Sequence, residues 1–331
     1  MSKSGKIKVG VVGVGALGKH HVRLYSQNKD VNLVGIYDIN PENSFNISRE
    51  FSVKSYPDID SLARDCEALS VVVPADIHYD IAIRLLGQNK HLLIEKPIAS
   101  KIEHAEEIVR LAEQKKLVLG VGHVERYNPV MSFLEERAKN TRFIEVHRLA
   151  TYPPPRPGQH RRGTEVGVVL DLMIHDLDII LRLVNSEIER VDAVGIPVLS
   201  PNEDIANVRL KFKNGCVANI TASRVSGEPM RRFRVFLNDA YLSLDNANKT
   251  GLIYKKHFLG IKKEDVPIHD HNALEKELED FVNCVLEAKK TGVSPSPKVS
   301  GWHGLEALRL AVNITEEIER YNKQYGAKPP K

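Results

Sequence analysis

Residues 8–18, KVGVVGVGALG, constrain the fold of this chain more than any other stretch. The apolar start of this stretch predicts a short buried strand, and its last six residues form the pattern G-x-G-x-x-G. A helical pattern follows over residues 16–28, and residues 31–37 predict a second buried strand. A strand, a glycine-rich turn, a helix and a second strand in this order predict the first unit of a doubly wound parallel sheet.

The residues of the turn suit the binding of a dinucleotide. Gly13 permits the tight turn, Gly15 allows the backbone to approach a pyrophosphate, and Gly18 lets the helix pack closely on the strand. Ala16 and Leu17 begin the helix, whose N-terminus favours an anion. We expect these five residues to bind the cofactor. A glycine-rich turn that binds nothing is the alternative.

An acidic residue follows the second strand at the position that such a site requires. Asp38 lies twenty residues after Gly18 and can accept hydrogen bonds from both ribose hydroxyls of an adenosine. Its negative charge would repel a 2′-phosphate. The sequence therefore predicts NAD, in preference to NADP, as the cofactor.

Length and composition limit the other possibilities. A chain of 331 residues predicts two domains, and a net charge of +4 gives no argument for a nucleic-acid partner. The first six residues carry no apolar leader and no apolar run is long enough to span a membrane, so we expect a cytoplasmic protein. The three cysteines are widely spaced and never form C-x-x-C, which argues against disulfides and a zinc knuckle.

The pattern of apolar segments changes along the chain. Strands and helices alternate from residue 7 to about residue 123, which predicts a Rossmann domain over residues 1–124. Strands dominate from residue 143 onward, and we expect an α+β domain with a large, open, mainly antiparallel sheet over residues 125–331. Its closing helices can pack back on the first domain. The expected strands are 8–12, 33–37, 68–73, 91–95, 118–121, 144–150, 189–198, 206–212, 217–223, 232–237 and 240–245, and the closing helices are 273–290 and 301–321.

Two further segments follow strands of the predicted parallel sheet. Ligands bind at the carboxyl ends of such strands, so we expect Pro74, His78, Glu95 and Lys96 to contact the cofactor. Lys96 lies between a buried strand and Pro97, and a cis bond at this point would tilt the lysine into the cleft. The alternatives are a histidine that only begins a helix and an ordinary surface lysine.

A crossover segment links the two predicted domains. Arg126, Tyr127 and Asn128 precede a proline, so their backbone should be extended and their side chains can project toward a substrate.

A helix predicted over residues 165–184 carries polar residues within an apolar frame. Asp171 and His175 are four residues apart on one face, and Asp178 continues that face. A histidine beside a carboxylate can act as a general base, because the carboxylate fixes its tautomer. A buried histidine with a polar contact is one alternative. Metal binding by these three residues is another, but no cysteine is spaced to join them and we expect no metal.

The chain resembles the Gfo/Idh/MocA oxidoreductases along nearly its whole length. The shared features are the glycine pattern with Asp38, the Glu95-Lys96-Pro97 triplet, and Asp171 followed by His175. The resemblance implies that Lys96 and His175 flank the reacting carbon, with Asp171 between or behind them. It also implies that the second domain shapes the substrate pocket and carries oligomer contacts. The apolar sheet face independently predicts a homodimer or homotetramer.

Within the family, the segments GHVERYNP at 122–129 and VGVVLDLMIHDLDII at 166–180 are most similar to nucleotide-sugar dehydrogenases. These oxidise UDP-N-acetylglucosamine at C3 to a 3-keto sugar, for 3-amino sugars of lipopolysaccharide. Residues 165–169, EVGVV, differ from the glycines that many members carry ahead of the aspartate.

A basic loop precedes the predicted helix. Guanidinium groups bind diphosphates through paired hydrogen bonds, so this loop is a candidate site for the diphosphate of a UDP-sugar. A solvated cluster or a subunit contact is the alternative. The loop contains Arg156, His160, Arg161 and Arg162, and a second basic group contains Arg224, Arg231, Arg232 and Arg234.

These features together predict NAD-dependent oxidation of a sugar ring hydroxyl to a ketone. His175 is the expected base, oriented by Asp171, and Lys96 donates a hydrogen bond to the reacting oxygen; Lys96 could itself be the base. Two alternatives remain: a dehydrogenase of a free polyol such as myo-inositol, and a non-catalytic NAD-binding regulator.

Overall fold

The computed structural model describes residues 5–138, 140–154, 164–258 and 260–326. The chain forms two compact units. The first contains residues up to 127 together with 272–306, and the second contains residues 128–271 together with those from 307 onward. Helix α9 (Gly301–Tyr325) therefore begins in the first unit and continues in the second.

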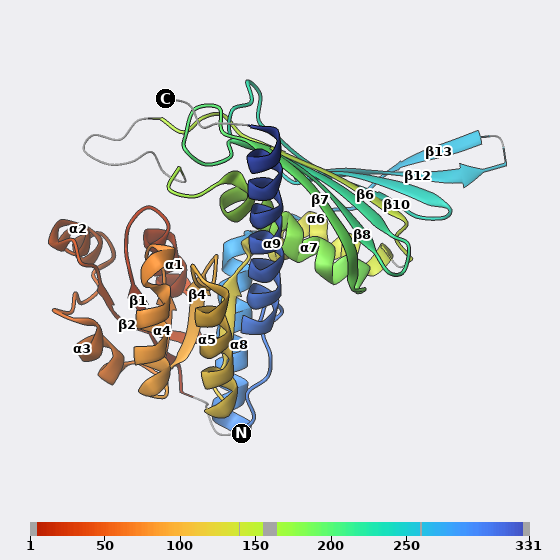
Figure 1. Cartoon of the computed structure of the whole chain (residues 1–331). Helices are drawn as coiled ribbons and strands as arrows, with labels where there is room; N and C mark the ends of the chain where they lie inside the picture. The colour runs from red at the N-terminus through yellow and green to blue at the C-terminus, as the bar shows by residue number, and fades with distance from the viewer. Residues whose placement is uncertain (1–4, 139, 155–163, 259, 327–331) are drawn as a thin grey trace. The chain divides into compact units, whose positions relative to one another are not determined.

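The first unit is built on a five-stranded sheet in which every pair of strands is parallel, in the order β2-β1-β3-β4-β5. Figure 1 labels β1, β2 and β4 of this sheet. Strands covered on both faces are apolar almost continuously, and five of the six residues of β1 are buried. The strands are β1 (Ile7–Val12), β2 (Val31–Tyr37), β3 (Ala68–Val71), β4 (His91–Glu95) and β5 (Leu119–Gly122).

Helices cover both faces of this sheet. Helices α1 and α8 share one core with β1, which includes Val9, Tyr25 and Phe281. On the other face, the side chain of Leu62 from α3 packs against Gly10. The helices of this unit are α1 (Gly18–Gln27), α2 (Pro41–Phe51), α3 (Ile59–Asp65), α4 (His78–Gly87), α5 (Ile102–Gln114) and α8 (Ala273–Thr291), with short turns η1 (Ala75–Ile77) and η2 (Val124–Tyr127).

The second unit contains an eight-stranded sheet in the order β13-β12-β11-β10-β6-β9-β8-β7. The β6–β9 pair is parallel and the other pairs are antiparallel. The strands are β6 (Phe143–Leu149), β7 (Ile188–Ile196), β8 (Ile205–Phe212), β9 (Val217–Ser223), β10 (Met230–Phe236), β11 (Ala240–Asp245), β12 (Thr250–His257) and β13 (Gly260–Asp265).

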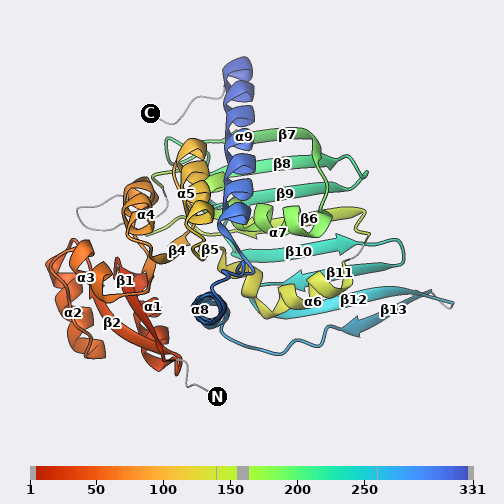
Figure 2. The same cartoon turned by 90° about the horizontal axis from the view of Figure 1, so that it is seen from below.

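One face of this sheet carries the core of the second unit. Buried and more exposed residues alternate along β8, so that Val208 and Leu210 point to the covered face. Helices α6 (Pro129–Arg137) and α7 (Ile174–Val184), with the second half of α9, lie over that face (Figure 2).

The predicted fold class, a Rossmann domain followed by an α+β domain with a large open sheet, is confirmed. The helix expected over residues 165–184 was wrong at its start, because a π-helical turn, η3 (Val169–Met173), precedes α7. Strands β12 and β13 were not predicted. In the described ranges, no helix is long and apolar enough to cross a membrane.

Candidate active site

The glycine-rich turn of the first unit has the geometry that only glycine allows. Gly13 adopts a φ of +86°, and its N–H donates to the carbonyl of Tyr37 at 2.8 Å. A Cβ atom at Gly13 would lie 2.2 Å from the carbonyl oxygen of Val72. A Cβ atom at Gly18 would lie 1.9 Å from the carbonyl oxygen of Gly13. Glycine is therefore required at both positions, at the turn and at the start of α1.

Gly15, the middle glycine of the pattern, faces open space. A Cβ atom at Gly15 would meet no described atom within 4 Å. Ala16 is exposed and Leu17 is half-buried directly before α1. This arrangement leaves room for a ligand at the helix N-terminus, as the pyrophosphate of a dinucleotide would require.

Asp38 lies directly beside the glycine-rich turn. Its Oδ2 accepts a hydrogen bond from the N–H of Val14 at 2.8 Å, and its Oδ1 accepts one from the N–H of Asn40 at 2.8 Å. The side chain is half-buried. The structure therefore brings together the turn and the acid, which the sequence separates by twenty residues.

The buried ring of His78 contacts the backbone of two loops. The ring is 1 % exposed, with Nδ1 lying 2.9 Å from the carbonyl oxygen of Pro97 and Nε2 lying 2.9 Å from that of Val73. Burial lowers its pKa, although the two carbonyls oppose this effect. His78 links the loops that follow β3 and β4, and Pro74 begins the first of these loops. We therefore assign His78 to positioning these two loops, and its expected contact with the cofactor stays a prediction.

Lys96 follows β4 directly, at the carboxyl end of the sheet. It is half-buried, and its peptide bond to Pro97 is cis. Glu95 is buried, and its Oε1 lies 3.3 Å from Nε2 of His21 in α1. Burial opposes ionisation of Glu95, but the contact with His21 and the charge of Lys96 outweigh it and lower the pKa of this carboxyl.

Gly122, the last residue of β5, and His123, the residue after it, complete the surroundings of Glu95. A Cβ atom at Gly122 would lie 2.9 Å from the carboxylate oxygens of Glu95, so the carboxylate packs directly on the backbone there. His123 is fully buried, and burial together with the charge of Lys96 lowers its pKa to about 3. Sequence reasoning missed His21 and His123, because a histidine in a helix or after a strand has no distinctive spacing.

Residues of η2 form hydrogen bonds within the first unit. The Tyr127 hydroxyl donates to Oδ2 of Asp280 at 2.7 Å, and the same oxygen accepts from the N–H of Lys298 at 2.8 Å. Nζ of Lys298 also donates to the carbonyl of Arg126 at 2.8 Å. The Arg126 and Tyr127 side chains are buried. These contacts fix η2 within the first unit, and the expected contact of Arg126 and Tyr127 with a substrate stays a prediction.

Asn128 is the N-cap of α6. Its Oδ1 accepts from the N–H of Val130 at 3.2 Å, and its Nδ2 donates to the carbonyl of Asn246 at 3.2 Å. Pro129 occupies the first position of the helix, where a missing N–H has no cost. The local Asn-Pro sequence therefore explains the capping role of Asn128, and its expected contact with the substrate stays a prediction.

The second unit carries the predicted base and its carboxylate at the start of one helix. Asp171 lies in the π-helical turn η3, and His175 is the second residue of α7; both are half-buried. The N–H of Ile174 donates to the carbonyl of Val169, five residues earlier, which marks the π-type turn. Such turns occur frequently at functional sites.

Neighbouring residues anchor this helix in the unit. Asp176 is 1 % exposed and accepts two hydrogen bonds from Arg148 of β6, at 2.7 and 2.8 Å. Asp178 is also buried. Within the described ranges, no group of three or more His, Cys, Asp or Glu side chains could hold a metal ion.

The structure describes only the second of the two predicted basic groups. The predicted diphosphate ligands Arg156, Arg161 and Arg162, with His160, lie outside the described residues. Arg224 of the second group is 2 % exposed, and its Nε donates to Oδ1 of Asp204 at 2.7 Å. Arg224 is therefore a buried structural cation. Arg234 pairs with Glu145 at 2.6 Å.

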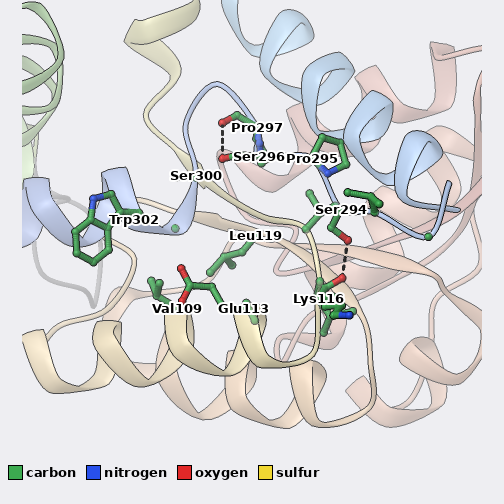
Figure 3. A pocket seen from close by; sticks show the side chains of 16 residues that line it. Val109, Glu113, Lys116, Leu119, Ser294, Pro295, Ser296, Pro297, Ser300 and Trp302 are labelled. Carbon is green, nitrogen blue, oxygen red and sulfur yellow. Dashed lines mark hydrogen bonds between the residues drawn. The ribbon is translucent and has the colours of Figure 1, made fainter. Parts of the chain in front are cut away.

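The first unit also contains a cavity of about 500 Å³, and Figure 3 shows the side chains that line it. It is lined by the end of α5, by Val118 and Leu119, and by the segment before Trp302. Val118 and Leu119 mark the amino end of β5, whereas Gly13, Asp38 and Lys96 lie at the carboxyl ends of strands. The cavity is therefore not the predicted cofactor site.

The Rossmann sheet, its glycine-rich turn with Asp38, and the open sheet of the second unit define an NAD(P)-dependent oxidoreductase that acts on CH–OH groups. Residues 7–123 match the model of an oxidoreductase family with an NAD-binding Rossmann fold, and residues 140–243 match the GFO/IDH/MocA C-terminal domain. The chain belongs to the Gfo/Idh/MocA family of oxidoreductases.

Relatives with known names support this assignment. The chain is 35% identical over 322 residues to a UDP-N-acetylglucosamine 3-dehydrogenase of Acidithiobacillus ferrooxidans, which covers 95% of this chain and 98% of that protein. A solved structure of that enzyme matches with a TM-score of 0.87 at 33% identity, over 96% of this chain and 99% of that chain. The myo-inositol 2-dehydrogenase of Thermotoga maritima is 25% identical over 332 residues, covering 95% of this chain and 96% of that protein.

Proposed function

We propose that this protein oxidises the C3 hydroxyl of UDP-N-acetylglucosamine, or of a related UDP-sugar, to a ketone with NAD as the hydride acceptor. The observation that carries this proposal is the similarity to the Acidithiobacillus enzyme, which extends through both units at 35% identity. Fold alone does not identify a substrate. The similarity over the second unit therefore matters, because in this proposal that unit binds the sugar.

The preference for NAD rests on the residues around Asp38. Its carboxylate lies at the glycine-rich turn, where the adenosine ribose of a dinucleotide binds in this fold. The next two residues are Ile39 and Asn40, so neither supplies the cation that accommodates a 2′-phosphate in NADP-binding sites. A negative charge without an adjacent cation favours a ribose with two free hydroxyls.

The proposed reaction moves a hydride and a proton from one carbon and its oxygen. NAD held at the glycine-rich turn and Asp38 would supply the acceptor for the hydride from C3 of the sugar, and the hydroxyl proton would pass to a base. His175 is the proposed base, with Asp171 orienting its ring, and Lys96 donates a hydrogen bond to the reacting oxygen. In a second form of this mechanism Lys96 is the base.

The nucleotide part of the substrate needs its own site. The arginines at positions 156, 161 and 162 supply guanidinium groups suited to a diphosphate, and we assign them to that role. Because Arg224 is buried against Asp204, the second basic group is a weaker candidate.

The uncovered face of the eight-stranded sheet is the proposed subunit interface. Phe236 stacks on Tyr241, and Tyr241 stacks on Tyr254, with ring centroids 4.6 and 5.1 Å apart. These rings alternate along their strands with buried residues, so they point away from the covering helices. An aromatic surface of this kind fits a homodimer or homotetramer. Cytoplasmic localisation stays a prediction from the sequence.

One alternative has a specific observation in its favour. The similarity to the Thermotoga enzyme also covers nearly the whole chain, so oxidation of a free polyol such as myo-inositol is the second candidate. In that case the arginine-rich segment would contact another subunit. A non-catalytic NAD-binding regulator is a weaker candidate, because a sensor has no need of Lys96, Asp171 and His175 together.

A substrate panel separates these candidates. The protein would be incubated with NAD and, in turn, UDP-N-acetylglucosamine, other UDP-sugars, free N-acetylglucosamine and myo-inositol, while NADH absorbance is followed. We expect NADH with a UDP-sugar and little with the free compounds. NADH formed only with free polyols would favour the second candidate, and tight NAD binding without any turnover would favour the regulator.

A further inference from the structure

A buried acid packs against the start of the π-helical turn in the second unit. Glu203 lies in the segment between β7 and β8 and is 9 % exposed. Its carbonyl accepts a hydrogen bond from the N–H of Val168 at 3.0 Å, and its Oε1 accepts one from the N–H of Val169 at 3.3 Å. Glu203 therefore holds two successive N–H groups that have no partner within the helix.

The Glu203 side chain also packs against Gly167, the residue before Val168 and Val169. A Cβ atom at Gly167 would lie 1.7 Å from Oε1 of Glu203 and 2.0 Å from its Cδ. Any larger residue at this position would displace the Glu203 carboxylate, which gives a physical reason for the single glycine in EVGVV. Glu203 thus touches three consecutive residues of the backbone.

Two of these three residues, Gly167 and Val169, also accept hydrogen bonds that form the next turn. The carbonyl of Gly167 accepts from the N–H of Asp171 at 3.1 Å, and the carbonyl of Val169 accepts from the N–H of Ile174. His175 follows Ile174 directly. Any shift of residues 167–169 would therefore be passed to both Asp171 and His175 through the helix backbone.

We propose that Glu203 is a positioning residue that sets the place of Asp171 and His175 by holding residues 167–169. This inference rests on the roles given to those two residues in the proposed function. Misplacement of a reacting group by about 1 Å can cost about 10²-fold in rate. A buried support of the first helical turn can therefore control turnover without touching the substrate.

Other side chains hold the backbone before Gly167, so Glu203 is the side chain that supports residues 167–169. Arg224 donates from Nη1 to the carbonyl of Val166 at 2.8 Å and is itself held by Asp204, so the chain before Gly167 is fixed independently. Burial raises the pKa of the Glu203 carboxyl, which favours its neutral form. Glutamine is therefore a close substitute for this acid, while leucine removes the acceptor at similar size.

The test compares Glu203→Gln and Glu203→Leu with the wild type, using a UDP-sugar that the wild type oxidises. We expect kcat to stay within about threefold in the Gln variant and to fall about 10- to 100-fold in the Leu variant. KM for NAD should be unchanged, and the isotope effect with substrate deuterated at the reacting carbon should rise in the Leu variant. Unchanged kcat per folded molecule in the Leu variant would overturn the proposal.

A matched control comes from the same region. Glu319 of α9 is exposed and lines a cavity of about 490 Å³ that Glu203 also lines. Glu319→Leu makes the same chemical change at this cavity, and we expect its kcat to equal that of the wild type. An equal loss of kcat in the Glu319 and Glu203 Leu variants would contradict a specific role for Glu203.

A second measurement separates this inference from the proposed function. Backbone amide hydrogen exchange at Val169 and Asp171 should be faster in the Glu203→Leu variant than in the wild type and the Glu319→Leu variant. Exchange that is unchanged at both amides would overturn the proposal. If the wild type turned over no sugar, the proposed function would fail and this comparison alone would decide whether Glu203 holds the turn.

Discussion

The Nε2 atom of His21 in α1 lies 3.3 Å from Oε1 of Glu95 at the end of β4. Both side chains are buried, and the pKa of the Glu95 carboxyl is below its ordinary value because His21 and Lys96 outweigh the effect of burial. An ionised carboxylate is therefore held directly before Lys96. This pair connects the helix that begins at the glycine-rich turn with the strand that delivers the proposed catalytic lysine.

Replacing either proposed catalytic side chain should stop turnover without preventing cofactor binding. We expect Lys96→Ala and His175→Ala each to lower kcat by about 10²- to 10⁴-fold, the usual contribution of a general acid or base. The affinity for NADH, measured by fluorescence titration, should stay nearly unchanged. Near-normal turnover in either variant would remove that residue from the mechanism. Lys101→Ala, an exposed lysine after the same strand, is the control.

Removing the carboxylate of Asp38 should weaken the preference for NAD over NADP. We expect Asp38→Ala to lower the ratio of kcat/KM for NAD to that for NADP by about tenfold, which corresponds to about 1.4 kcal/mol. The Asn43 side chain also contacts Asp38, so Asn43→Ala tests the same loop without a change of charge. An unchanged ratio in the Asp38 variant would show that another residue selects the cofactor.

A buried acid in α8 should make stability depend on pH. Glu277 is 1 % exposed, and burial together with the charges of Glu95 and Asp280 raises its pKa well above 4.5. The folded protein therefore keeps a proton that the unfolded chain releases above about pH 4.5, so this group's contribution to stability falls as pH rises from there.

Glu277→Gln removes this titration while keeping the shape of the neutral acid. Compared with the wild type, the variant should gain stability as the pH of the melting experiment is raised from 5 to 8. Tyr25→Phe, which removes a buried hydroxyl from the same core, should shift the melting temperature equally at both pH values. The same difference between wild type and Glu277→Gln at pH 5 and pH 8 would contradict a raised pKa.

Breaking the buried ion pair of the second unit should cost far more than breaking an exposed one. Arg224→Ala leaves Asp204 buried without its cation, and we expect a loss of about 3–5 kcal/mol in the free energy of unfolding. Arg190→Ala breaks the exposed pair with Asp192 and should cost under about 1 kcal/mol. Equal losses in the two variants, measured by denaturant unfolding, would contradict this difference.

The sequence predicted the parts of the fold that local patterns determine. The glycine spacing with Asp38 and the strand before Lys96 have strict local requirements, and Gly13 and Gly18 occupy positions where a Cβ atom would clash. The π-helical turn was not predictable from periodicity, because it is held by Glu203, a residue distant in sequence. Strands β12 and β13 were missed because most of β13 is exposed and polar.

The candidate site also contains residues whose roles the sequence did not predict. His78, Tyr127 and Asn128 are polar residues at loops, and sequence alone does not distinguish a side chain that faces a ligand from one that binds its own backbone. The structure gives each of them a partner, namely two loop carbonyls, Asp280 and a helix N-terminus. Pro97 and Asp280 lie far along the chain from His78 and Tyr127, so no local pattern indicates these partners, whereas the Asn-Pro pair at Asn128 is itself a local capping signal.

Transfer of deuterium from the sugar to the cofactor tests the central claim most directly. UDP-N-acetylglucosamine deuterated at C3 would be oxidised with NAD, and the reduced cofactor would be analysed by mass spectrometry and proton NMR. We predict deuterium at C4 of the nicotinamide and a slower reaction than with the undeuterated sugar, because the C3 hydrogen leaves as a hydride. Reduced cofactor without deuterium, or deuterium retained in the sugar product, would contradict the account.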